Sequence, residues 1–166
     1  HFRRGLVDIG RRTRASAKAD YPARAAIELA ANGNDSSSPL KGERIADAQG
    51  IPLMFLENTL LDLRVGGLDN SRRGPEGGYW LAQPAEKVSV ADVFRAAEGP
   101  LASVRGEKPE DLDYAGNAEA LRDVWVALRA SLRDVLEHVT LADIAAGKLP
   151  KEVSSLTREP GAWQRR

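Results

Sequence analysis

The stretch Ile45-Ala-Asp-Ala-Gln-Gly-Ile-Pro-Leu-Met-Phe-Leu-Glu-Asn58 decides the fold, because its spacing matches two helices joined by a tight turn. A helix-turn-helix needs a small residue where its helices cross, a turn-tolerant residue four positions later, and an apolar residue six beyond that. Ala46, Gly50 and Leu56 meet these demands. The triplet alone is a weak signal, because all three residue types are common and a plain three-helix core can produce it.

Two helices are predicted before the turn. Apolar residues recur four apart over residues 18–32, which is typical of one face of a helix, and Pro22 is expected in its first turn. After a polar loop, the second helix covers residues 40–49, with Ile45 and Ala46 facing inward. Together with the helix that follows the turn, these segments predict a compact three-helix core.

The third helix follows the turn directly. Pro52 is expected in its first turn, where the missing N–H costs nothing, and Gly66 ends the helical pattern. Four leucines spaced 3, 4 and 3 predict its buried face: Leu53, Leu56, Leu60 and Leu63.

A small hairpin is predicted next. Residues 68–72 and 79–82 read as short strands, and the glycine-rich segment Arg73-Gly-Pro-Glu-Gly-Gly78 allows the reversal between them. A winged helix-turn-helix places its second helix in the major groove and such a hairpin, the wing, beside it. Arg72 and Arg73 at the wing tip could enter the minor groove, whose negative potential attracts arginine.

The second half of the chain has a longer helix as its main feature. A short helix over residues 88–98, with Ser89 as its N-cap, precedes an acidic connector, and a further short helix is expected at 141–146. Between them lies a heptad seam, made of Leu121, Trp125, Leu128, Leu132, Val135 and Val139. A second copy packing along this seam would bury it. Packing against the chain's own N-terminal domain is the alternative.

Composition sets the broad class. The chain has 166 residues, with 24 Lys and Arg against 24 Asp and Glu, and its longest uncharged stretches are nine residues. A membrane span needs about 18 apolar residues, so we expect a soluble, cytoplasmic protein with no membrane partner. Residues 1–24 carry a net charge of +5 and residues 89–150 a net charge of −4, so only the N-terminal part is suited to face phosphate.

Four segments in register resemble the Rrf family of winged helix-turn-helix regulators. They are Arg14-Ala-Ser-Ala-Lys-Ala-Asp-Tyr21, the stretch from Ile45 to Asn58, Arg73-Gly-Pro-Glu-Gly-Gly-Tyr79, and Val90-Ala-Asp-Val-Phe-Arg-Ala-Ala-Glu-Gly-Pro100. The resemblance implies a homodimeric regulator of double-stranded DNA, commonly a repressor, with a mainly α fold and a small β-hairpin wing. Four segments are expected: a flexible lead-in at 1–13, a DNA-binding domain at 14–100, a connector and dimerisation helix at 101–147, and a flexible tail at 148–166. The lead-in is either native or artificial in origin.

The resemblance also implies which residues contact DNA. Those expected to read bases are Pro52, Met54, Phe55, Glu57 and Asn58 on the second helix, and Arg73 and Gly74 on the wing. Those expected to contact phosphates are Arg14, Ser16, Lys18 and Tyr21. Glu57 can accept a hydrogen bond from cytosine N4, Asn58 can pair with adenine, and Met54 or Phe55 can contact a thymine methyl group. For Lys18 and Arg72, the alternative is an ordinary solvated side chain.

The chain departs from the family where cluster-binding members carry three cysteines and often a histidine. The corresponding span, Gly99 to Val124, contains neither residue, so no iron–sulfur cluster and no other cofactor or metal is expected. Three weaker sensing features remain: the acidic connector (Glu107, Glu110, Asp111 and Asp113), a ligand pocket between Trp80 and Trp125, and His138. A small-molecule effector or a partner enzyme stays open as the source of regulation. An enzymatic function has little support, because the chain has no cysteine nucleophile and no phosphate-binding glycine loop.

Overall fold

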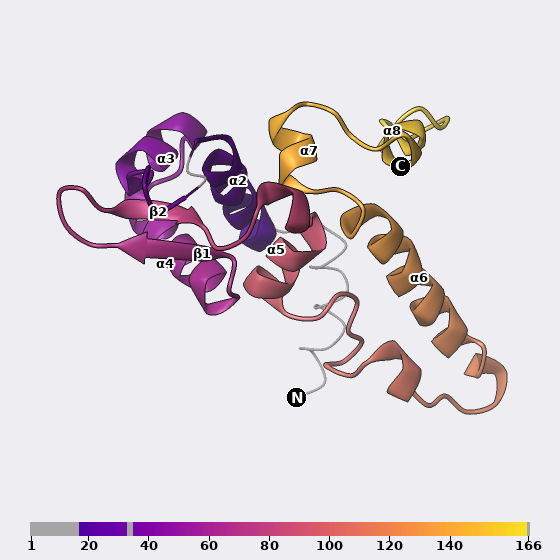
Figure 1. Ribbon diagram of the computed structural model, residues 1–166. Coiled ribbons are helices and arrows are strands. Elements are labelled where there is room, and N and C mark those ends of the chain that lie inside the picture. The colour runs from indigo at the N-terminus through magenta and orange to yellow at the C-terminus, as the bar shows by residue number, and fades with distance from the viewer. Residues whose placement is uncertain (1–16, 33–34, 166) are drawn as a thin grey trace.

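The computed structural model describes residues 17–32 and 35–165, and it is mainly helical with one two-stranded hairpin (Figure 1). The predicted fold class is therefore confirmed. In chain order the helices and strands are α2 (Ala17–Asn32), α3 (Gly42–Gln49), α4 (Leu53–Val65), β1 (Asp69–Arg72), β2 (Gly78–Leu81), α5 (Val90–Glu98), α6 (Leu121–Leu136), α7 (Leu141–Ala145) and α8 (Lys151–Leu156). Three single-turn 3₁₀ helices lie between them: η1 (Ala85–Lys87), η2 (Pro109–Asp111) and η3 (Gly116–Ala118).

The core forms where α2 packs against α4, α5 and α7. Leu56, Leu60 and Leu63 of α4 are buried in it, as their spacing predicts. Leu53 is not, because it is 39% exposed on the first turn of α4, where the helix has only begun to approach the core. The prediction that Leu53 belongs to the buried face is wrong.

Two prolines lie elsewhere than expected. Pro52 is the N-cap of α4, one position before the first helical residue, with φ −56° and ψ 132°. Pro22 lies inside α2, because that helix extends back to Ala17. Proline in a helix interior removes one backbone hydrogen bond. Pro22 is buried, so it also fills space in the core.

The turn between α3 and α4 depends on Gly50. This residue has φ +62° and ψ +35°, a left-handed conformation that glycine adopts without penalty. The N–H groups of Gly50 and Ile51 both donate to the carbonyl oxygen of Ala46, with the second bond at 3.0 Å. These bonds satisfy the end of α3 and direct the chain into α4.

The hairpin is antiparallel, with register from Asp69 opposite Leu81 to Arg72 opposite Gly78. Leu40 extends it, because Leu40 and Tyr79 exchange two backbone hydrogen bonds of 2.8 Å. The hairpin is therefore joined to the segment just before α3. At its turn, a Cβ atom on Gly77 would lie 2.0 Å from the carbonyl oxygen of Arg72, so only glycine fits there.

Two capping boxes organise the start of α5 and of α7. Ser89 and Asp92 form the first, Thr140 and Asp143 the second, and Ser89 and Thr140 are themselves bridged. The predicted N-cap at Ser89 is confirmed. These reciprocal bonds fix two helices of the core at a common point.

Helix α6 ends at Leu136, before the last residue of the predicted seam. The expectation that the seam continues along this helix to Val139 is wrong. Val139 follows the helix, is buried, and accepts a backbone hydrogen bond of 2.9 Å from Val90. The chain leaves the helical path there in order to pack against the start of α5.

The C-terminal segment also differs from expectation. The sequence predicts a flexible tail over 148–166, and within the described part of this segment the structure contains α8 and further turns (Figure 1). Pro150 caps α8 with φ −53°, and Ser154 and Ser155 donate side-chain hydrogen bonds to nearby carbonyl groups. Such local hydrogen bonds do not require apolar residues at helical spacing, so the sequence pattern does not indicate α8.

Candidate DNA-binding surface

The residues predicted to read bases lie on the exposed side of α4 and just before it. Met54 is 71% exposed and Phe55 is 52% exposed. Pro52, Glu57 and Asn58 are exposed as well. The buried leucines occupy the opposite side of the helix, so the core holds α4 while one side of its first two turns faces solvent.

An aromatic and cationic contact joins α2 to the start of α4. The rings of Tyr21 and Phe55 lie 6.5 Å apart between centroids, and the guanidinium of Arg24 lies 4.9 Å from the centroid of Tyr21. Arg24 also donates a hydrogen bond of 2.7 Å to the carbonyl oxygen of Gln49 at the turn. Tyr21 is therefore positioned beside the turn. The prediction from sequence missed Arg24, and only its place in the basic N-terminal segment could have indicated it.

Three of the predicted phosphate contacts are not described. Arg14 and Ser16 lie outside the described residues, and so does the side chain of Lys18. Tyr21 is the remaining member of that set, and it is half-buried between α2 and α4. The phosphate-contacting roles stay predictions.

The wing carries one arginine that is held and one that is free. Arg72 donates a hydrogen bond of 3.1 Å to the carbonyl oxygen of Ser36, and its guanidinium lies 5.9 Å from the ring of Trp80. Arg73 and Gly74 are exposed at the tip. Within 17–32 and 35–165, the guanidinium of Arg73 makes no hydrogen bond or ion pair. Arg73 is thus the wing cation available to a ligand.

Lys41 fixes the position of the wing tip. Its Nζ donates to the carbonyl oxygens of Gly74 and Pro75, at 3.1 Å and 2.6 Å. Lys41 precedes α3, so this contact joins the tip to the helix-turn-helix. No sequence pattern indicates it, because the partners lie more than thirty positions apart.

Asp69 is a buried acid at the junction between α4 and the wing. Its side chain is 1% exposed, and neither carboxylate oxygen has a hydrogen-bond partner among the described residues. Burial raises the pKa of Asp69 to about 7, and Arg64, with its Nε 3.9 Å away, opposes that rise. Burial also raises the pKa of the neighbouring Tyr79. Sequence reasoning missed Asp69.

The predicted seam lies on α6, a helix with no fully buried residue. Leu121, Trp125, Leu128, Leu132 and Val135 are all half-buried. On one side α6 contacts the connector, where Trp125 Nε1 donates a 3.0 Å hydrogen bond to the Tyr114 hydroxyl and Arg129 pairs with Glu110. The rest of the helix extends away from the core (Figure 1).

The three candidate sensing features do not come together. Over the described residues, no group of three or more His, Cys, Asp or Glu side chains is placed to hold a metal. His138 is exposed, with Nδ1 2.7 Å from the carbonyl oxygen of Asp134. Trp80 lines a cavity of about 780 Å³, and Trp125 is not among the residues that line it, so this cavity is not one that both indoles share. None of the helices in the described part of the chain is long and apolar enough to cross a membrane.

Comparison with known proteins identifies the relatives of this chain. Residues 15–147 match the Rrf2 family model, described as an iron-dependent transcriptional regulator. A Mycobacterium tuberculosis H37Rv protein, provisionally named HTH-type transcriptional regulator Rv1287, is 52% identical over 143 residues, which cover 86% of this chain and 88% of the relative. The HTH-type transcriptional regulator CymR of Bacillus subtilis is 31% identical over 131 residues, covering 79% and 88% of the two chains. A cysteine-ligated iron site does not fit this chain, which contains no cysteine.

Solved structures show the same similarity. CymR (YrzC), the global cysteine regulator of B. subtilis, superposes with a TM-score of 0.66 at 29% identity, covering 80% of this chain and 96% of that one. T. potens IscR superposes with a TM-score of 0.62 at 30% identity, covering 80% and 85%. The named relatives are transcriptional regulators and not enzymes. This chain therefore belongs to the Rrf2 family of helix-turn-helix transcriptional regulators.

Proposed function

We propose that this chain binds a specific pseudo-palindromic site on double-stranded DNA as a homodimer and represses transcription there, without an iron–sulfur cluster. The observation that carries the proposal is the exposed face of α4, with Met54, Phe55, Glu57 and Asn58 beside a wing whose Arg73 is exposed. Acting on chromosomal DNA, the protein works in the cytoplasm.

In this proposal α4 enters the major groove. Glu57 accepts from cytosine N4, Asn58 pairs with adenine, and Met54 or Phe55 contacts thymine methyl groups. The wing lies over the adjacent minor groove, where Arg73 meets the most negative potential. The Lys41 contact supports this role, because it holds the tip in place before DNA arrives.

The dimer is proposed from α6. A helix of 16 residues without one fully buried side chain is poorly covered by its own chain, and its half-buried residues recur at heptad spacing. Two copies related by a two-fold axis would place two α4 helices on successive major grooves. That arrangement requires a half-site repeat of about one helical turn.

Regulation without cysteine ligands needs another input. A small-molecule effector is one source, and a partner protein that docks on the regulator is the other. A partner protein could contact the exposed surface of the acidic connector. The cavity beside the wing favours a small molecule as the regulatory ligand.

The test is to select bound fragments from a genomic DNA pool with the purified full chain, then to titrate the recovered site by fluorescence anisotropy at several salt concentrations. We expect an enriched pseudo-palindrome with steep salt dependence, because phosphate contacts release counterions. A scrambled site of equal length and composition is the control. Equal affinity for both sites would contradict the proposal. A stoichiometric partner recovered from a cell extract, with no DNA site selected, would favour the alternative that this chain is a protein-interaction module.

A further inference from the structure

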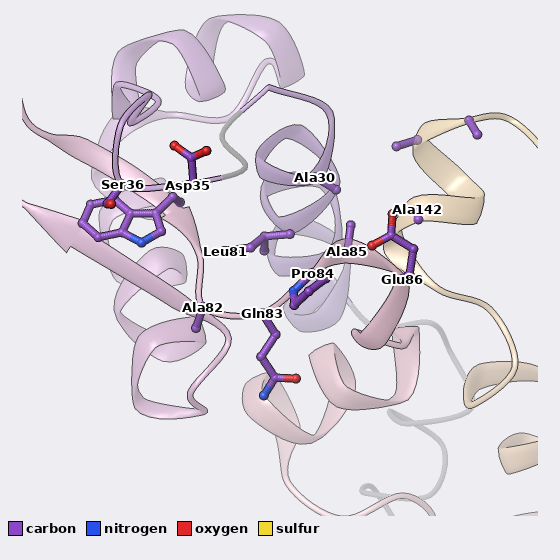
Figure 2. A pocket seen from close by; sticks show the side chains of 13 residues that line it. Ala30, Asp35, Ser36, Leu81, Ala82, Gln83, Pro84, Ala85, Glu86 and Ala142 are labelled. Atoms are coloured by element: carbon purple, nitrogen blue, oxygen red, sulfur yellow. The ribbon is translucent and has the colours of Figure 1, made fainter.

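A cavity beside the wing is not used by the proposed DNA contacts. It measures about 780 Å³ and lies where α2, the loop after it, the end of β2, η1 and α7 meet (Figure 2). Trp80 and Leu81 come from the wing, Asp35 and Ser36 from the loop, and Ala142 from α7. Its volume is in the range of small-molecule sites.

The lining of this cavity combines apolar and acidic residues. Most of the lining residues are alanine, leucine, proline or Trp80, polar atoms contribute close to half of the lining surface, and the two ionisable lining residues are Asp35 and Glu86. In Figure 2 Asp35 lies on the loop at one side and Glu86 lies near Ala142 at the other. Lys, Arg and His are absent from the described lining.

Both acids are suited to receive a cation. Asp35 Oδ1 accepts from the Ser37 N–H at 2.8 Å, and hydrogen bonds from Ser37 lower the pKa of Asp35, so it is charged at neutral pH. Across the described residues, the Glu86 carboxylate has no ion pair or hydrogen bond of its own. The Trp80 ring adds a face that attracts cations.

We propose that this cavity binds a small organic cation, an amine with a short apolar body. Its ammonium group would pair with Glu86 or Asp35, and its apolar part would contact the alanines and the indole. A carboxylate or phosphate ligand is disfavoured, because the lining offers it two negative charges and no positive one.

Binding at this site would act on the wing, and this step rests on the proposed DNA-binding function. Arg72 already lies 5.9 Å from the Trp80 ring and donates to Ser36, and both partners line the cavity. A second cation at the ring repels Arg72 and weakens its contact with Ser36. Because Arg73 follows Arg72 directly, the amine shifts the wing tip and lowers the affinity for DNA.

Calorimetry on the full chain at pH 7 tests the site. The probes are 1,4-diaminobutane and benzylamine, and the matched neutral compounds are 1,4-butanediol and benzyl alcohol. We expect saturable binding of at least one amine and none of the neutral compounds. Glu86→Gln should weaken binding by about fivefold, the loss expected for one exposed charge pair, whereas Glu119→Gln, an exposed acid outside the cavity, should not. Absence of amine binding, or equal binding of the neutral compounds, overturns the proposal.

Anisotropy with the selected DNA site tests the regulatory step. In an amine titration the wild-type chain should lose DNA affinity by about fivefold or more at saturation, and the Glu86→Gln chain should need about five times more amine for the same loss. An effect of the amine on the DNA itself would appear at the same amine concentration with both chains. Amine binding with unaltered DNA affinity overturns the regulatory step. Amine binding by a chain that selects no DNA site contradicts the proposed function and leaves the cation site standing.

Discussion

At the scale of single residues, Asp69 has the most unusual environment described. Its carboxyl group is buried at the first position of β1, where neither oxygen accepts a hydrogen bond from the described residues and the Arg64 Nε lies 3.9 Å away. A buried charge without hydrogen bonds is costly, so the neutral form is favoured in the folded state. The protein therefore has a group whose charge changes near neutral pH at the point where α4 joins the wing.

The stability of the fold should depend on this group. The folded-state pKa of about 7 lies above the ordinary value of 3.8, so the contribution of Asp69 to stability is fully present below about pH 4 and is lost as the pH rises through 7. The free energy of unfolding should fall across that window by up to about 1.4 kcal/mol per pH unit from this group. The free energy of unfolding, measured by urea unfolding at several pH values, should change less with pH in the Asp69→Asn variant than in the wild-type chain. The Asp47→Asn variant, which alters an exposed acid on α3, should keep the wild-type dependence on pH. An unchanged slope in Asp69→Asn would contradict the assignment.

A second prediction at the residue scale concerns Arg73 and the affinity for DNA. Removing its exposed, unpaired guanidinium with Arg73→Ala should weaken binding to the selected site by about 1 to 3 kcal/mol, because an arginine in a narrow minor groove gains both charge attraction and hydrogen bonds. Anisotropy titration measures the loss. Arg158→Ala, an exposed arginine near α8, is the matched control, and equal affinity of the two variants would remove Arg73 from the interface.

Individual site residues were predictable to the extent that a local pattern marked them. The exposure of Met54, Phe55 and Asn58 follows from the helical period of α4, because the leucines take the opposite side. The contacts of Lys41 and Asp69 were not predictable, because each depends on a tertiary neighbour. A lysine before a helix and an acid at the start of a strand are ordinary surface residues on sequence alone.

At the scale of elements, boundaries were predicted well where a cap or a glycine marks them. Ser89 begins α5 and Gly50 ends α3 as expected, because those residues satisfy backbone groups at helix ends. The end of α6 was misplaced because no breaker precedes Val139, whose apolar side chain continues the seam pattern while its burial is against α5. The helix α8 was missed because its bonds are local and its residues show no apolar period.

The turn between α3 and α4 yields a prediction about an element. Gly50→Ala should lower the free energy of unfolding by about 1 to 2 kcal/mol, because an L-residue pays this to adopt the left-handed conformation. A Cβ atom added at Gly50 would meet nothing within 4 Å, so the loss would come from the backbone and not from a clash. Thermal unfolding measures it. Gly50→Asn should lose less, since asparagine tolerates this conformation, and a larger loss for asparagine would contradict the explanation.

At the scale of the whole molecule, the proposed DNA-binding surface and the proposed dimer seam lie on different parts of the chain. The helix-turn-helix and wing occupy one end, while α6 extends from the other part of the chain with its half-buried seam (Figure 1). The family resemblance and the heptad spacing predict this division from sequence. The family resemblance and the heptad spacing could not predict the cavity, because its lining residues come from segments distributed between Ala30 and Ala146.

The seam leads to a prediction about assembly. The wild-type chain should sediment as a dimer, and Leu132→Asp should shift it toward monomer, because a carboxylate in an apolar seam is left without a partner. Loss of the dimer should also weaken binding to the full palindrome by far more than binding to a half-site. Ser131→Asp, exposed on the same helix, is the control. A Leu132→Asp chain that remains dimeric and folded would place the interface elsewhere.

The crowded turn of the wing has a consequence for how regulators of this type diverge. Any side chain at Gly77 would collide with the backbone of Arg72, so that position is closed to substitution while the loop keeps its shape. The neighbouring exposed positions, Arg73, Pro75 and Glu76, face no such restriction from burial. If the wing reads DNA as we propose, exchanges of these exposed side chains would alter the preferred operator while the backbone of the loop keeps its shape.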